Sequence, residues 1–127
     1  MPRFVVLRHQ TPPGYPRPLH WDLMLEKEGA LATWALEAEP VAGCSLTATV
    51  LKDHRLDFLD FEGPLSKERG EVSRYDAGIY ETLAEDSGSL VVRLRGRKVD
   101  GQVTIEKISG NGNAVEIRFD PHPTTSG

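Results

Sequence analysis

Apolar and polar residues alternate over short segments along most of the chain, which is the pattern of β-strands that bury one face. In residues 19–26, LHWDLMLE, the alternation places tryptophan and leucine side chains on one face and His20 and Asp22 on the other. Turns rich in glycine, proline or asparagine separate these segments. The predicted strands span residues 3–9, 20–26, 30–37, 45–52, 54–63, 71–83, 89–96, 102–108 and 114–119.

The number and spacing of the strands predict the fold class. About eight short strands with turns between them indicate a mainly β protein, a small closed or nearly closed antiparallel β-barrel with one or two short helices. Residues 27–30, KEGA, predict a hairpin turn. Gly78 is expected to break its strand, and residues 66–70, SKERG, to form a short helix.

Length and composition narrow the class of protein. A chain of 127 residues has the size of one domain, predicted here as residues 1–127 with a flexible tail at 119–127. Its 39% hydrophobic and 27% charged residues are typical of a folded protein, and no apolar run approaches the roughly 20 residues that cross a bilayer. We therefore expect a cytoplasmic monomer without membrane contact.

Cysteine content and net charge exclude further classes. Cys44 is the only cysteine, so an intramolecular disulfide and a zinc site built from cysteines are both impossible. The net charge of −4 argues against wholesale electrostatic binding to nucleic acid. A local basic patch on one face stays compatible with that charge.

Histidines at strand ends are the candidate chemistry. His9 closes the first predicted strand, while His20 and Asp22 open the second on one face, and strand ends meet at the rim of a barrel. Two imidazoles and a carboxylate suit a divalent transition metal such as manganese, zinc or iron. The alternative is a solvated polar pair with no chemistry, and His54, which follows Asp53, is open to the same two interpretations.

Four segments in order resemble the 3′-phosphoesterase domain of bacterial ligase D proteins. They are FVVLRH (4–9), LHWDLMLE (19–26), LKDHRLDFLDFEG (51–63) and YDAGIYE (75–81), and the similarity extends from about residue 4 to residue 119. The resemblance implies a metal-dependent repair activity on the side of a β-barrel, trimming ribonucleotides and phosphate from 3′ ends.

The resemblance also implies roles for individual residues. His9, His20 and Asp22 match the family's metal ligands, with manganese preferred and zinc possible. His54 matches a histidine that contacts the scissile phosphate, so His20, Asp22 and His54 form the expected catalytic group. Six further residues match and are expected to act as scaffold: Asp60, Phe61, Glu62, Gly63, Asp76 and Tyr80.

Three positions depart from the family. Met24 and Leu46 stand where the family has arginines, and Phe58 stands where it has a tyrosine, so three polar groups expected to face phosphate are replaced. The proline-rich loop at 10–18 is also longer than in the family. Arginines near the expected site could restore the lost charge, and the candidates for phosphate binding beside His54 are Arg17, Arg55 and Arg8.

Three functions are compatible with these observations. The first is a metal-dependent phosphoesterase that trims 3′-ribonucleotide or 3′-phosphate ends of nucleic acid, such as a primer-template, in DNA end repair. The second is a catalytically degenerate metal-binding module that binds DNA ends or recruits a separate ligase or polymerase. The third is a phosphoesterase acting on a different substrate.

Overall fold

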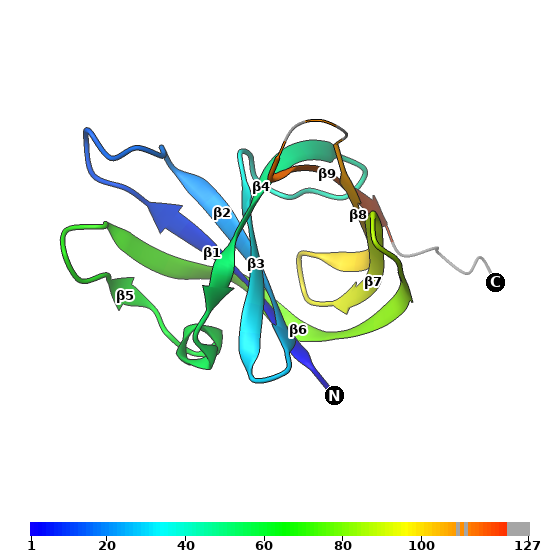
Figure 1. Ribbon diagram of the computed structural model, residues 1–127. Coiled ribbons are helices and arrows are strands. Elements are labelled where there is room, and N and C mark those ends of the chain that lie inside the picture. The colour runs from blue at the N-terminus through cyan, green and yellow to red at the C-terminus, as the bar shows by residue number, and fades with distance from the viewer. Residues whose placement is uncertain (109, 111, 122–127) are drawn as a thin grey trace.

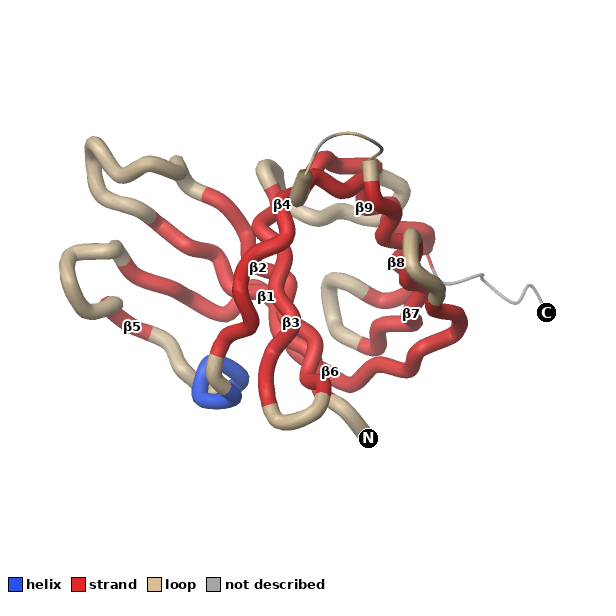
Figure 2. Tube along the Cα trace, viewed as in Figure 1, coloured by secondary structure: helices blue, strands red, loops and turns tan. Residues whose placement is uncertain are grey.

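Nine strands and one short helix make up the computed structural model, which describes residues 1–108, 110 and 112–121 (Figure 1). The strands are β1 (Arg3–Gln10), β2 (His20–Lys27), β3 (Ala30–Leu36), β4 (Ser45–His54), β5 (Gly63–Pro64), β6 (Glu71–Glu85), β7 (Ser89–Arg95), β8 (Asp100–Lys107) and β9 (Ala114–Pro121). The helix is η1 (Leu56–Leu59), a single 3₁₀ turn (Figure 2).

All strand pairs are antiparallel, and eight of the strands close into a ring. The order is β1-β2-β3-β4-β9-β8-β7-β6, and β6 pairs back onto β1. Strand β5 lies outside the ring, beside the first two residues of β6. The prediction of a small antiparallel barrel is confirmed. In Figure 1 the loop after β1 and the segment around β5 extend away from the barrel on one side.

Both faces of β1 and β2 are buried, which the alternation pattern did not predict. Phe4 and Leu23 point into the barrel interior with the main core. The opposite faces contribute to a second core outside the ring, where Met24 packs with residues from other elements. The members of this outer core are Val5, Leu7, Met24, Leu31, Leu59 and Val72. Polar groups on the outer face of these strands are therefore surrounded by protein rather than by water.

Strand β6 is continuous, so the expected break at Gly78 is wrong. Its 15 residues pair with β1 through Ile79 and with β7 from Ile79 onward. A Cβ at position 78 would lie 2.0 Å from the carbonyl oxygen of Arg95. The glycine thus permits close approach of two backbones where the strand changes partners.

The segment after β4 also differs from the prediction. Residues 54–63 were expected to form a strand, but the chain turns at Arg55 into η1, and Leu59 packs into the outer core. The expected helix at 66–70 is wrong, because Lys67 and Glu68 have φ angles of 59° and 53°. Such angles belong to a turn and not to a right-handed helix.

The β2–β3 hairpin and the end of β9 are two further points at which the structure can be compared with the prediction. The hairpin predicted at 27–30 is confirmed, with Glu28 and Gly29 at φ angles of 51° and 83° between β2 and β3. Strand β9 continues to Pro121, so residues 119–121 belong to the sheet and not to a tail. Residues 122–127, including His122, lie outside the described part of the chain.

In the part of the chain that the structure describes, no helix is long and apolar enough to cross a bilayer.

Candidate metal centre

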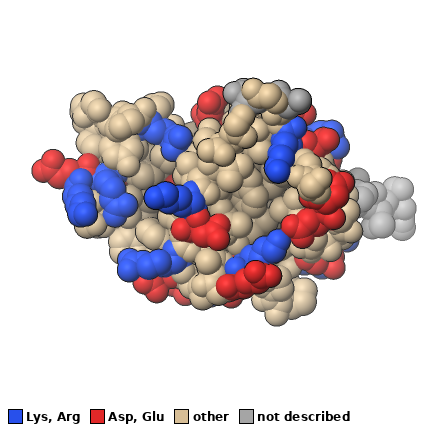
Figure 3. All heavy atoms as spheres, in the orientation of Figure 1, with Lys and Arg blue, Asp and Glu red and all other residues tan. Residues whose placement is uncertain are grey.

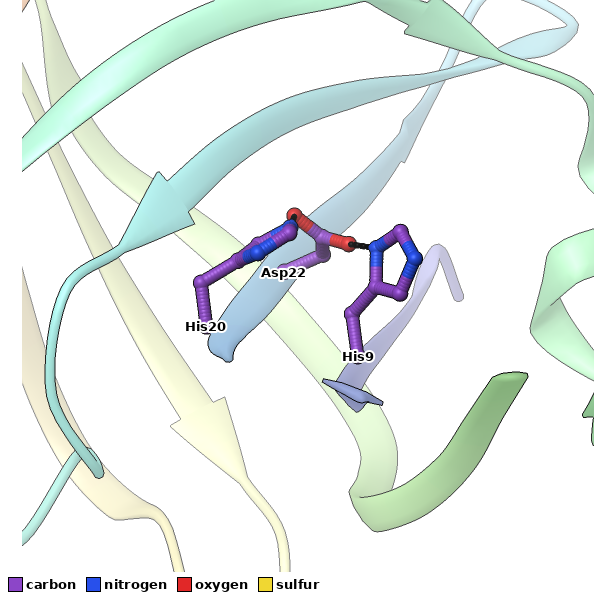
Figure 4. A group of neighbouring side chains, drawn as sticks. All are labelled: His9, His20 and Asp22. Atoms are coloured by element: carbon purple, nitrogen blue, oxygen red, sulfur yellow. Dashed lines mark ion pairs between the residues drawn. The ribbon is translucent and has the colours of Figure 1, made fainter. Parts of the chain in front are cut away.

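The two strands β1 and β2 place three potential metal ligands together on the outer face of the barrel. His9 and His20 are direct cross-strand partners, and Asp22 is opposite Leu7, two pairs further along. Residues two apart on a strand share a face, so all three side chains point to the same side. Figure 4 shows the Asp22 carboxylate lying between the two imidazole rings.

The three side chains are close and buried. His9 Nδ1 lies 3.5 Å from Asp22 Oδ2, and His20 Nε2 lies 3.2 Å from Asp22 Oδ1. One ligand atom from each residue falls within 4.8 Å of the others, and the two ring centroids are 4.6 Å apart. This group of three can hold a metal ion.

A backbone carbonyl group forms a hydrogen bond with the outer ring nitrogen of each histidine. His9 Nε2 lies 2.8 Å from the carbonyl oxygen of Arg69, and His20 Nδ1 lies 2.9 Å from that of Pro18. Since a carbonyl only accepts, each of these nitrogens donates its proton outward. In the neutral rings the inner nitrogens therefore carry lone pairs toward Asp22, which is the arrangement of metal-bound histidines with backbone partners.

The turn that supplies the Arg69 carbonyl depends on the glycine beside it. Gly70 has a φ angle of 95°, and a Cβ there would lie 2.0 Å from the carbonyl oxygen of Gln10 at the end of β1. Only glycine combines this backbone conformation with so close an approach. The contact brings the turn against β1, next to His9.

Charges in the group are coupled. Burial disfavours the charged form of His9, but only that form donates from both ring nitrogens, to Asp22 and to the Arg69 carbonyl, and these hydrogen bonds raise the pKa of His9. Burial likewise opposes the charge on Asp22, yet the neighbouring imidazoles of His20 and His9 lower the pKa of that carboxyl. Asp22 therefore offers an anionic ligand at neutral pH.

An unsatisfied oxygen supports the fit of a cation. Asp22 Oδ1 is buried and accepts no hydrogen bond, although His20 Nε2 is 3.2 Å away. With the His20 proton on Nδ1, a lone pair and an anionic oxygen face each other, which is costly in a buried site. A cation bound between Asp22 and the two rings removes this cost, so the donor set fits a divalent metal.

A cavity of about 450 Å³ opens over the three ligands. Arg17 from the loop after β1 and Arg55 from the start of η1, two of the candidates for phosphate binding, line it. Lys52 and Arg69 also line it, and the sequence analysis missed both. Lys52 lies two residues before His54, a spacing that puts both on one side of β4. This spacing could have identified Lys52 from the sequence.

His54 reaches the same cavity from the end of β4. Its Nδ1 lies 2.9 Å from the carbonyl oxygen of Lys52, so this nitrogen donates and Nε2 stays available to a ligand. The candidate Arg8 is not among the cavity-lining residues. It follows Leu7 and precedes His9 on β1, so alternation turns it to the opposite face, and we withdraw it from the phosphate-binding set.

The three positions that depart from the family pattern separate in space. Met24 and Phe58 line the cavity, whereas Leu46 packs against the barrel core and lies outside the cavity lining. The expectation that Leu46 faces phosphate is therefore wrong. Met24 is only 1% exposed and fills the outer core, so two polar groups, not three, are replaced at the cavity wall.

Two of the expected scaffold residues, Asp76 and Tyr80, make hydrogen bonds that hold the barrel together. Asp76 accepts hydrogen bonds from the backbone N–H groups of Arg97, Lys98 and Val99 at 3.1, 2.9 and 2.7 Å. Tyr80 donates its hydroxyl to the carbonyl of Glu26 at 2.6 Å. These bonds fix the β7–β8 turn and join β6 to β2.

Basic side chains lie near the candidate site on the surface. Figure 3 shows several Lys and Arg residues on the side that carries β5 and the loop after β1, at left, although the chain is acidic overall. A local basic surface of this kind was the form of nucleic-acid contact that the net charge left open.

The ring of antiparallel strands and the buried His-His-Asp group on its outer wall define a β-barrel domain with a candidate metal centre beside a cationic cavity. The chain belongs to the family described as the DNA Ligase D 3'-phosphoesterase domain, whose sequence model matches residues 9–107. His9, His20, Asp22 and His54 all fall within the matched range.

Three similar proteins belong to longer chains. "Multifunctional non-homologous end joining protein LigD" of Mycolicibacterium smegmatis is 32% identical over 125 residues, which is 85% of this chain and 16% of that protein. The corresponding protein of Mycobacterium tuberculosis is 27% identical over 117 residues, 85% of this chain and 15% of that one. The LigD protein of Pseudomonas aeruginosa is 32% identical over 94 residues, 66% of this chain and 11% of that protein. The chain thus spans about a sixth or less of these relatives.

Proposed function

We propose that this chain is a metal-dependent phosphoesterase that trims 3′-ribonucleotide or 3′-phosphate ends of nucleic acid during DNA end repair. The observation that carries the proposal is the pair of inner histidine nitrogens facing Asp22, each fixed by a carbonyl behind it, at the floor of a cavity lined by cations. Membership of the family supports the reaction class. The names of the relatives support the context of end joining.

His9, His20 and Asp22 would hold the metal, with manganese preferred and zinc possible. A divalent cation bound there supplies Lewis-acid polarisation of a phosphoryl oxygen and a water of lowered pKa. His54, with Nδ1 engaged by the Lys52 carbonyl, would present Nε2 to the phosphate. As an imidazolium it would donate to an oxygen on which charge develops.

Cationic side chains around the cavity would hold the phosphate in place. Arg17 is half-buried in its proline-rich loop, which restricts its motion and reduces the entropy lost on binding. Arg55 and Arg69 line the same cavity. Together they would replace the charge lost through Met24, since a guanidinium binds phosphate with two parallel hydrogen bonds.

The test is manganese-dependent trimming by metal-free protein. Manganese is titrated while hydrolysis of a primer-template ending in one ribonucleotide, or in a 3′-phosphate, is followed. His20→Ala should abolish both manganese binding and trimming, whereas Arg17→Ala should keep manganese binding and lose most of the trimming. Arg97→Ala, an exposed arginine in the β7–β8 turn, is the matched control and should behave as wild type.

A second function has one specific observation in its favour. Met24 and Phe58 line the cavity where the family has groups that donate hydrogen bonds, which favours a degenerate module that binds metal and DNA ends without turnover. Manganese binding without trimming of any substrate would establish that module and overturn the enzyme. A separate ligase or polymerase would then be the partner to seek.

A further inference from the structure

A second cavity, of about 300 Å³, adjoins the first. The two share Arg55, Phe58, Leu65 and Arg69, so they are continuous across the surface between η1 and the turn after β5. The second cavity contains neither the candidate metal ligands nor His54, and apart from the shared arginines the proposed chemistry gives its residues no role. Its own residues include Phe61.

Aromatic rings connect the two cavities. The ring of Phe58 lies 5.5 Å from that of His54 and 5.9 Å from that of Phe61, with interplanar angles of 73° and 81°. Phe58 packs against the outer core and is fixed there. Phe61 ends the row and is 36% exposed, the only aromatic side chain among the described residues that reaches this level. Its exposed face is open to a planar ligand in the second cavity.

Charge on the second cavity suits an anion beside the ring. Arg55 and Arg69 border both cavities. Asp57 is the acidic residue of the second cavity, and its Oδ2 lies 4.0 Å from Arg55 Nε, with side chains 79% and 83% exposed. So exposed a pair is weak, and a phosphate can replace the carboxylate at the guanidinium. Arg69 donates to Ser66 through Nε and Nη2, which orients its guanidinium at the border.

We infer that the second cavity is a nucleoside subsite, in which Phe61 stacks on the base of the nucleotide on the 5′ side of the phosphate held at His54. Exposed aromatic rings flanked by cations are how proteins hold single-stranded nucleic acid. This inference rests on the proposed function and adds a substrate class, a strand end with an unpaired or frayed terminal base.

The choice of the 5′ nucleoside follows from the two substrates. A 3′-ribonucleotide and a 3′-phosphate differ on the 3′ side of the scissile phosphate, where the second has no nucleoside at all. The nucleoside on the 5′ side is common to both. An aromatic surface next to the phosphate site would therefore bind the 5′ nucleoside, which is the same in both substrates.

The experiment measures binding of a fluorescent, 3′-phosphorylated DNA strand to metal-free protein in chelator, so that no turnover is needed. Phe61→Ala should weaken binding about tenfold, the loss expected for one stacked base, and Phe61→Trp should restore it. An abasic site at the 3′-terminal nucleoside should weaken wild type by the same factor and Phe61→Ala no further. Leu83→Ala removes a more exposed apolar side chain on β6, outside both cavities, and should change nothing.

The outcomes separate this subsite from the proposed function. If Phe61→Ala binds as wild type, or if the abasic strand weakens the variant as much as wild type, the stacking subsite is overturned, whatever the trimming assay gives. If wild type fails to trim with manganese while these binding results hold, the phosphoesterase fails and the nucleoside subsite stands as part of an end-binding module.

Discussion

The imidazole of His9 donates from Nε2 to the carbonyl oxygen of Arg69, 2.8 Å away and 60 residues along the chain. This bond ties the orientation of one candidate metal ligand to a surface turn. The turn reaches β1 only because Gly70 carries no Cβ. Ligand geometry at the barrel wall therefore depends on a residue that contributes no functional group.

Gly70→Ala tests this dependence. The new Cβ would meet the Gln10 carbonyl at 2.0 Å, so the turn must move and the His9 bond must lengthen or break. We expect manganese affinity to fall by about 10- to 100-fold, as for loss of other partners behind a ligand. Calorimetric titration measures it. Gly88→Ala, whose Cβ has no neighbour closer than 3.8 Å, is the control, and equal affinity in the two variants would disprove the link.

Asp76→Ala should destabilise the barrel without touching the candidate metal centre. The substitution leaves three backbone donors of the β7–β8 turn without their acceptor. We expect a loss of about 3 kcal/mol in the free energy of unfolding, with a smaller loss for Asp76→Asn. Urea unfolding gives the first quantity. Manganese affinity of the folded variant should match wild type, and a change in it would assign Asp76 to the site.

Tyr80→Phe should cost about 1 kcal/mol, because the hydroxyl of Tyr80 donates to the Glu26 carbonyl at 2.6 Å. Burial raises the pKa of Tyr80. Above the ordinary tyrosine pKa of about 10 the unfolded chain loses this proton while the folded chain keeps it, so wild-type stability falls as pH rises further. The gap in urea midpoint between wild type and Tyr80→Phe should therefore narrow from pH 9 to pH 11. A constant gap would contradict the assignment.

Substitutions of Met24 distinguish packing from phosphate contact. Met24→Ala opens a void in the outer core and should cost about 3 kcal/mol. Met24→Leu conserves volume and should cost under about 1.5 kcal/mol. If Met24 only packs, Met24→Leu keeps the wild-type rate of trimming and manganese affinity. A marked loss of either in this variant would give the thioether a direct role.

Sequence pattern was sufficient for the barrel and for the grouping of the candidate ligands. Alternation at His20 and Asp22 fixed a shared face, and the strand end at His9 brought the third group beside them. The prediction of a strand over residues 54–63 failed because apolar and acidic residues alternate there. This pattern fits a strand, but it also fits a 3₁₀ turn that buries Leu59.

Other features had no signal in the sequence. Arg69 contributes its backbone carbonyl to His9, and any residue type could do so at that position. The burial of Met24 arises from elements distant in sequence, so its strand alone indicated a solvated face. Placement of Arg8 on the wrong face was avoidable, since neighbouring residues on a strand point to opposite sides.

The two-sided burial of β1 and β2 makes the candidate centre a reporter of the folded state. A slip of β2 by one residue would turn His20 and Asp22 toward the barrel interior and send Leu23 outward, leaving His9 without the other two ligands. No shifted register keeps the three ligands together. High metal affinity therefore requires the native pairing of β1 and β2 in the closed barrel. Metal binding can then serve as a measure of native structure in any variant of this domain.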